Sequence, residues 1–307
     1  MSSSQLRRLR DDDAEHVAAL YERAFGEARR LDSEEIRSWL RNSELKPEWL
    51  CVLEIGGRLV GYGDISVEET EVALDAAAPG HWGAFLDWAE ETAREAGVPR
   101  VRVYLPAPAI ELADIVRRRG YRLWRSSYTM ETLLDDVAPV ALPDGLELRA
   151  YRPGVDEERL RATLNEVFAA DPLFHQLSAA GFREFYLRAR GYDPSLWLLA
   201  WDVEELVGFA LVYPERAGNT ELGWVQSLGV RAPWRRRGVG EALLRAAFRE
   251  LQRRGLSRVG LGVDAENTTG ALRMYERAGM RPVSRGDNWV LDLAQPQQSS
   301  QNRRAAT

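Results

Sequence analysis

The chain has 307 residues, and since a typical domain has roughly 100 to 200 residues, two domains are expected. Its 45% hydrophobic and 29% charged residues are typical of a globular protein, and its net charge of −6 argues against nucleic-acid binding, which needs a basic face. The first residues lack the pattern of a signal peptide, and no apolar run reaches the length of about 18 residues needed to cross a membrane. We therefore expect a cytoplasmic protein without a membrane partner.

The cysteine and histidine content predicts no metal site. The single cysteine, Cys51, lies in the apolar run 49–53, which indicates a small buried residue and not a reactive thiol. His16, His81 and His175 are far apart and show no zinc-ligand spacing.

The first half of the chain contains a strand, a helix, a hairpin, a long amphipathic helix and a further strand. These elements are expected at 6–10, 15–25, 49–62, 82–95 and 100–105. Gly56 and Gly57 supply the hairpin turn, and Gly97 is a candidate C-cap of the long helix.

The second half repeats this order. The corresponding segments are 146–150, 157–168, 196–209, 239–254 and 258–263. The offsets from Gly97 to Gly255 (158 residues) and from Gly120 to Gly279 (159 residues) agree within one residue.

A segment rich in proline and turn-forming residues, 137–145, is the expected linker between the two units. We therefore predict an N-terminal domain at 1–136, a C-terminal domain at 146–294 and a disordered tail at 295–307. Each unit combines a hairpin with a strand–helix–strand crossover. This predicts an α/β fold of two tandem domains, each an α+β mixed sheet flanked by helices.

The clearest local signal is a basic glycine loop between a strand and a helix. The strand at 224–230 is followed by Arg235-Arg236-Arg237-Gly238-Val239-Gly240. A helix start offers unpaired N–H groups, and glycines allow a phosphate to approach the backbone, so we predict a pyrophosphate site. The plainer alternative is a turn with solvated arginines.

Two other phosphate loops fit less well. No Gly-Lys-Ser/Thr follows, which excludes a P-loop. The third glycine of a dinucleotide fingerprint is missing near Leu243, although Asp264 stands roughly where a ribose-binding acid would, so a nucleotide-dependent oxidoreductase stays an alternative.

The same loop matches the Q/R-x-x-G-x-G/A motif of the GCN5-related N-acetyltransferase (GNAT) superfamily. A second motif of that family is matched by Asn267, Ala271, Tyr275, Gly279 and Met280. The chain thus resembles this superfamily over residues 146–293.

The resemblance implies acetyl-CoA as co-substrate and no metal. It assigns the following residues to cofactor binding: Leu228, Gly229, Val230, Arg235, Arg236, Arg237, Gly238, Val239, Gly240, Glu241 and Asn267. It further implies that the Leu228 N–H polarises the thioester carbonyl and that Tyr275 protonates the leaving thiolate.

The general base departs from the family pattern. Many members carry a glutamate six residues before the position of Val230, where this chain has Trp224. The candidates left by the sequence are Glu221, which we select, Asp264 and Glu266. Trp224 is expected to line the acceptor pocket, along with Trp197, Trp201 or Trp289.

The first half lacks the cofactor residues. Ala77, Ala78 and Pro79 replace the three arginines, and Trp82 replaces Gly240. Pro108 and Val116 stand where the second half has Asn267 and Tyr275. Tandem units with one working half resemble the mycothiol synthases, which acetylate the cysteinyl amine of a sugar–inositol thiol precursor.

The resemblance implies an N-acetyltransferase that moves an acetyl group from acetyl-CoA to a small-molecule primary amine by direct transfer in the C-terminal domain. The expected partner is this amine acceptor, and the chain is expected to be a monomer or homodimer. Besides the oxidoreductase, a non-catalytic acyl-CoA-binding module stays open as an alternative.

Overall fold

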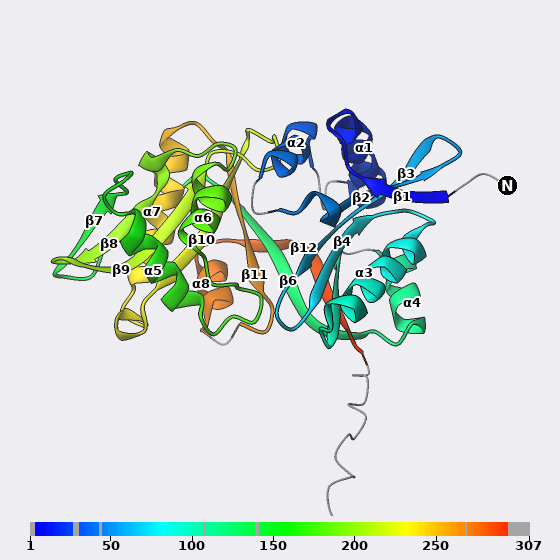
Figure 1. The fold of residues 1–307 in the computed structure, drawn as a ribbon. Helices are drawn as coiled ribbons and strands as arrows, with labels where there is room; N and C mark the ends of the chain where they lie inside the picture. The colour runs from blue at the N-terminus through cyan, green and yellow to red at the C-terminus, as the bar shows by residue number, and fades with distance from the viewer. Residues whose placement is uncertain are drawn as a thin grey trace, which may run out of the picture. The chain divides into compact units, whose positions relative to one another are not determined.

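A computed structural model describes residues 4–26, 31–42, 45–106, 109–138, 141–267 and 269–293. The chain folds into two units, and neither is continuous in sequence (Figure 1). Unit 1 comprises Met1–Gly26, Pro47–Arg125 and Gly286–Thr307, and unit 2 comprises Glu27–Lys46 and Ser126–Arg285. The tail expected at 295–307 lies outside the described residues.

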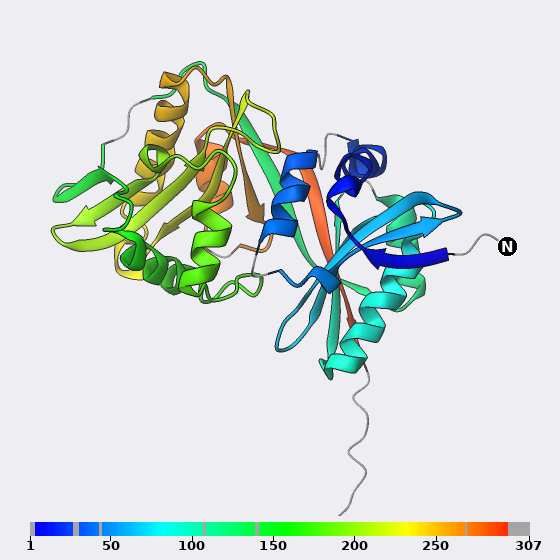
Figure 2. The same ribbon diagram turned by 45° about the horizontal axis from the view of Figure 1, so that its top comes forward.

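Unit 1 is a mixed sheet with helices on both faces. Its elements are β1 (Ser4–Arg8), α1 (Ala14–Phe25), β2 (Leu50–Ile55), β3 (Arg58–Val67), β4 (Val72–Ala77), α3 (Trp82–Ala96), β5 (Arg100–Pro106), α4 (Ile110–Arg118) and most of β12 (Arg281–Asp292). The strand order is β1-β2-β3-β4-β5-β12, with β4 and β5 parallel. Gly63 of β3 faces Phe85 of α3, whereas the adjacent Tyr62 contacts Tyr21 of α1, so these two helices cover opposite faces (Figure 2).

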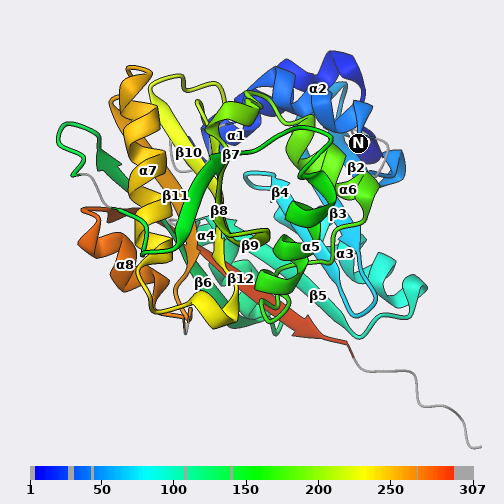
Figure 3. The same ribbon diagram turned by 90° about the vertical axis from the view of Figure 1, so that its left-hand side faces the viewer.

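Unit 2 repeats this arrangement. Its elements are α2 (Ser33–Arg41), most of β6 (Arg122–Leu133), β7 (Leu146–Ala150), α5 (Glu157–Phe168), α6 (Ala179–Phe182), the π-helical turn η4 (Arg183–Leu187), β8 (Leu198–Asp202), β9 (Glu205–Tyr213), β10 (Leu222–Val230), α7 (Val239–Arg253), β11 (Arg258–Asp264) and α8 (Ala271–Arg277). The strand order is β6-β11-β10-β9-β8-β7, with β10 and β11 parallel. Helix α7 lies on one side of the central strands and α5 on the other (Figure 3). The predicted mixed sheet flanked by helices is confirmed in both units.

The last strand of each sequence repeat completes the sheet of the other unit. Strand β6, at the end of the first repeat, pairs with β11 from Ser127↔Asp264 to Leu133↔Arg258. Strand β12, at the end of the second repeat, pairs with β5 from Gly286↔Pro106 to Asp292↔Arg100. The units therefore differ from the expected boundaries 1–136 and 146–294, because sequence periodicity identifies a strand without identifying the sheet that the strand joins.

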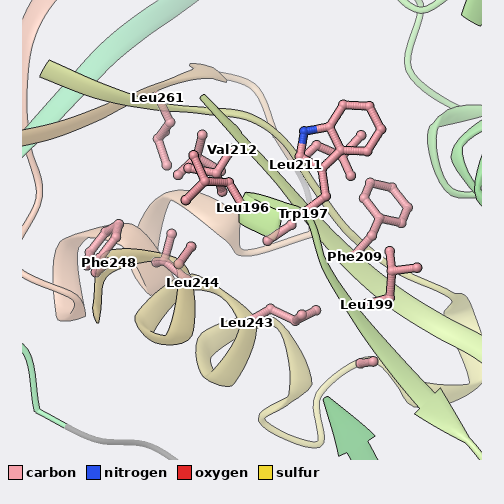
Figure 4. Packing of buried hydrophobic residues seen from close by; sticks show 14 of the residues in the cluster. Leu196, Trp197, Leu199, Phe209, Leu211, Val212, Leu243, Leu244, Phe248 and Leu261 are labelled. Carbon is pink, nitrogen blue, oxygen red and sulfur yellow. The ribbon is translucent and has the colours of Figure 1, made fainter. Parts of the chain in front are cut away.

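The core of unit 2 lies where α7 packs on the sheet. Leu243, Leu244 and Phe248 of α7 pack on the sheet face that carries Val212 and Leu261 (Figure 4). These three residues of α7 form the apolar face of the amphipathic helix expected at 239–254. Phe209 of β9 points to the opposite face, where it contacts Phe168 of α5. Within the described ranges, no helix is long and apolar enough to cross a membrane.

Of the tryptophans suggested for an acceptor pocket, three belong to the cores. Trp197 and Trp201 are 0% and 1% exposed in the core of unit 2, and Trp289 is buried in the core of unit 1. The Trp197 ring packs among aromatic rings, and arginine guanidinium groups lie over the rings of Trp201 and Trp289. The expected linker is also partly packed, since Val137 and Leu142 contact the unit 2 core, whereas positions 139 and 140 lie outside the described residues.

Candidate functional site

Strands β10 and β11 separate halfway along β10. Their parallel pairing runs from Leu222↔Arg258 to Val225↔Leu261, and β10 then continues to Val230 along β9 alone. An irregularity in the β9 pairing between Val225 and Ser227 marks the place where the strands separate. The edge of β10 that faces β11 thus has no partner strand from Ser227 onward among the described residues.

Two peptide groups of β10 point into this opening. The Arg231 N–H donates to the Val207 carbonyl of β9 at 2.9 Å, and antiparallel peptide groups alternate in direction, so those of Leu228 and Val230 point away from β9. The Val230 carbonyl confirms the direction, because it accepts from Arg235 Nε at 2.8 Å. The Leu228 N–H therefore lies where an extended ligand arm could bind as a strand does.

The loop after β10 has the backbone shape of an anion site. Arg236 and Gly238 have positive φ angles of 64° and 86°. Residues that alternate between left- and right-handed conformations turn successive N–H groups to one side, and a non-glycine residue held at positive φ is strained. Gly238 is the N-cap of α7 and offers no side-chain cap, so the first N–H groups of the helix are open to a ligand.

The three arginines of the loop have different roles. Arg235 uses its guanidinium on the carbonyls of Val230 and Val167, and its own N–H donates to Ala232, so it braces the loop. Arg236 and Arg237 are exposed and, in the described part of the chain, form neither an ion pair nor a hydrogen bond with another side chain. These two guanidinium groups are therefore available to phosphates.

The start of α7 is packed closely on its other side. A Cβ at Gly240 would lie 3.3 Å from Met274 Sδ of α8, so a large side chain there would displace α8. Val239 is buried. The Glu241 carboxylate contacts Arg245 at 3.2 Å and Arg277 at 3.8 Å, which offsets its negative charge beside the loop.

Tyr275 lies on α8, next to Met274. Its side chain is 6% exposed, and burial raises the pKa of its phenol to about 12. The phenol therefore stays protonated at neutral pH, as a proton donor must.

The side chains of Asn267 and Asp264 accept hydrogen bonds within local turns, whereas Glu266 reaches the first repeat and Glu221 is exposed. Asn267 Oδ1 accepts from the Thr269 N–H at 2.9 Å, so this side chain shapes the turn before α8. Asp264 Oδ1 accepts from the Glu266 N–H at 2.8 Å, and Glu266 Oε2 accepts from the Ser126 N–H at 3.1 Å. Glu221 is exposed and lies just before β10, several residues before the point where β10 and β11 separate.

Trp224 is buried, with 9% of its surface exposed, but it does not belong to the main apolar cluster of unit 2. Its ring covers Gly260 of β11, whose Cβ would come within 2.9 Å of the ring. The Arg216 guanidinium lies 4.4 Å from the ring centroid. The expected place of Trp224 in an acceptor pocket stays a prediction.

A buried hydroxyl pair next to the opening was not identified from the sequence. Ser227 Oγ and the Tyr186 hydroxyl of η4 are 2.9 Å apart, and the Tyr186 carbonyl accepts from the Tyr213 hydroxyl. Tyr186 comes from a segment without a recognisable motif, so only the tertiary contact reveals it. The pair fixes the irregular stretch of β10.

The counterpart of the loop in unit 1 has a different character. Ala77 and Ala78 are fully buried and Trp82 is 5% exposed, so apolar side chains fill the place of the cationic loop. Gly80 keeps a positive φ of 75°, like Gly238. Pro108, expected at the place of Asn267, lies outside the described residues.

A cavity of about 440 Å³ in unit 2 is separate from these residues. It lies between α5 and the β8–β9 turn, and it is lined by residues that include Arg159, Thr163 and Arg231. None of the predicted site residues lines it. Arg231 is held there by ion pairs to Glu166 and Glu205.

Comparison with known sequences gives a consistent family. The model of the acetyltransferase (GNAT) family matches residues 161–280. The mycothiol acetyltransferase of Catenulispora acidiphila is 30% identical over 236 residues, 73% of this chain and 74% of that protein. The mycothiol acetyltransferase of Streptomyces scabiei is 31% identical over 273 residues, 86% of each.

Solved structures support the same fold. A GCN5-related N-acetyltransferase from Sphaerobacter thermophilus superposes with a TM-score of 0.76 at 29% identity, covering 94% of this chain and 95% of that one. A tandem GNAT protein from the clavulanic acid biosynthesis pathway gives a TM-score of 0.72 at 17% identity, covering 94% and 98%. The second likeness concerns the fold alone.

Proposed function

The chain belongs to the GNAT family of acetyltransferases, and we propose that it moves an acetyl group from acetyl-CoA to a primary amine of a small molecule. Transfer is direct, and acetyl-CoA binds in unit 2 only. The observation that carries the proposal is the unpaired edge of β10, which leads from Leu228 to the positive-φ loop at the start of α7.

Each part of this path suits one part of acetyl-CoA. The pantetheine arm has amide groups that pair with the outward peptide groups of Leu228 and Val230 as a strand would. The pyrophosphate binds the open N–H groups at Gly238, Val239 and Gly240, with Arg236 and Arg237 neutralising its charge.

The reaction forms one bond and breaks one. The neutral amine attacks the thioester carbonyl, whose developing oxyanion accepts a hydrogen bond from the Leu228 N–H. The C–N bond forms, the C–S bond breaks, the nitrogen releases one proton to a base, and Tyr275 donates its own proton to the departing thiolate. Because burial raises the pKa of Tyr275 to about 12, the phenol holds its proton until the thiolate forms.

The acceptor enters over Trp224, on the sheet face where the Tyr186 hydroxyl of η4 meets Ser227. The proteins named above as mycothiol acetyltransferases suggest an acceptor of the cysteinyl glucosaminide type. A cysteinyl glucosaminide therefore heads the panel of acceptors to be tested.

The test measures release of free coenzyme A from acetyl-CoA with a cysteinyl glucosaminide, glucosamine and S-methylcysteine as acceptors, and identifies the product by mass spectrometry. We expect an N-acetylated product from at least one of them. Absence of acetyl-CoA binding, or of any acetylated amine, would refute the proposal.

A further inference from the structure

The site in unit 2 includes a strand from the first repeat, and that strand carries a carboxylate. Glu131 of β6 is the registered partner of Gly260 in β11, and Gly260 is the registered partner of Trp224 in β10. Directly paired residues project from the same face of a sheet. Glu131 and Trp224 therefore lie on one face, which is also the face of Tyr213.

The glycine between them lets these side chains meet. A Cβ at Gly260 would lie 2.9 Å from Trp224 Cζ3 and 3.2 Å from Glu131 Cγ. Both side chains thus lean over the same glycine. A residue with a side chain at 260 would hold them apart.

Glu131 is shielded from solvent but only partly paired. Its side chain is 19% exposed, and its Oε2 lies 3.4 Å from Arg258 Nη1. Its Oε1 has no hydrogen-bond partner among the described residues. The carboxylate therefore keeps a free acceptor oxygen beside the indole of Trp224.

The position of this row of residues along the sheet matters as well. Trp224↔Gly260 is the pair just before Val225↔Leu261, the last pair before β10 and β11 separate. Glu131 is thus close to the closed end of the opening in which the acyl group would be held. Glu221, in contrast, is exposed and lies before the first residue of β10.

We infer that Glu131 is the proton acceptor of the reaction, an inference that rests on the proposed function. An amine that has attacked the thioester carries a positive nitrogen and must lose one proton. This proton passes to the Glu131 carboxylate along a chain of water molecules, because Glu131 lies two strands from β10 and Leu228 lies four residues beyond Trp224. The thiolate receives its proton from Tyr275. The first repeat, which lacks the cofactor loop, then supplies the base of the second.

The test compares Glu131→Gln with the wild-type protein in the pH profile of kcat/KM, with acetyl-CoA and an acceptor from the same panel. At pH 7 we expect kcat/KM to fall by about 10²-fold, a typical general-base contribution. The difference in kcat/KM between the wild-type protein and Glu131→Gln should become smaller toward pH 9.5, where the free amine is largely neutral. Glu131→Asp should keep the acidic limb of the profile in weakened form, and the affinity for acetyl-CoA should not change.

Glu147→Gln is the matched control. Glu147 is an exposed carboxylate on β7 of the same unit that also pairs with an arginine, Arg149, at 2.7 Å, so this variant removes a charge and an ion pair away from the opening. It should leave the profile unchanged. Melting temperatures of all variants separate a loss of fold from a loss of the base.

Two results would overturn the inference while the proposed function stands: a wild-type pH profile in Glu131→Gln, or loss of the acidic limb in Glu221→Gln instead. If the wild-type protein binds acetyl-CoA but acetylates no amine, the proposed function and the role of Glu131 as base are both refuted. A lower melting temperature of Glu131→Gln with an unchanged profile would show a structural ion pair with Arg258 and no role as base.

Discussion

Replacing Gly238 with valine tests the phosphate cradle with little disturbance of the core. Gly238 has a φ of 86°, and a Cβ there would meet no heavy atom within 4 Å. The new side chain therefore enters open space, where the phosphate must approach. Gly240→Trp is a less suitable variant, because the indole would collide with Met274.

The expected loss of affinity follows from the contacts that the valine blocks. A hydrogen bond to a charged group contributes about 1.5 to 3 kcal/mol, so loss of two N–H contacts to the pyrophosphate costs about 3 to 6 kcal/mol. This corresponds to a roughly 10²- to 10⁴-fold higher Kd. The left-handed backbone adds about 1 to 2 kcal/mol of strain to the folded state.

Gly80→Val in unit 1 is the matched control. Gly80 has a φ of 75° and likewise no heavy atom within 4 Å of its Cβ position, so the substitution introduces the same strain at the equivalent place in the other repeat. Both variants should lower the melting temperature to a similar extent. Only Gly238→Val should weaken binding of acetyl-CoA.

Titration calorimetry with acetyl-CoA measures both quantities, and we expect about one site per chain in the wild-type protein and in Gly80→Val. A stoichiometry near two would contradict the assignment of the cofactor to unit 2 alone. The same holds if Gly80→Val weakens binding as much as Gly238→Val does.

Three further predictions concern single side chains. Tyr275→Phe should lower kcat by about 10²-fold with little change in acetyl-CoA affinity, as expected for loss of a general acid. Because the pKa of Tyr275 is raised to about 12, the pH profile of the wild-type protein should show no alkaline limb from this phenol below pH 10. An equal kcat in the variant would show that Tyr275 is not the general acid. Trp224→Glu should change the acceptor KM and the pH profile while the protein stays folded, whereas a collapse of the melting temperature would mark Trp224 as a core residue, because burying an unpaired carboxylate is costly. Burial raises the pKa of the Cys51 thiol from 9.0 to about 11, which leaves about 10² times less thiolate at pH 8. A thiol reagent should therefore modify the native protein far more slowly than the unfolded chain. Equal rates of modification would contradict the burial of Cys51.

The sequence alone was sufficient to predict the repeat, the mixed sheets and the glycine loop, because these depend on signals that are local along the chain. The alternation of apolar residues identifies strands, the period of about 3.6 residues identifies helices, and Gly238 marks a helix start whose backbone needs a positive φ. The buried state of Cys51 followed from its apolar neighbours in the same way.

The tertiary structure alone decided which strands become neighbours. Strand pairing joins residues that are far apart in the chain, and β6 of the first repeat pairs with β11 of the second, which no local sequence pattern predicts. Arg235 was grouped with two free arginines, yet its guanidinium is used on backbone carbonyls. Glu131 belongs to no motif and lies in the first repeat, and it meets Trp224 only because Gly260, which lies between them in the sheet, has no side chain.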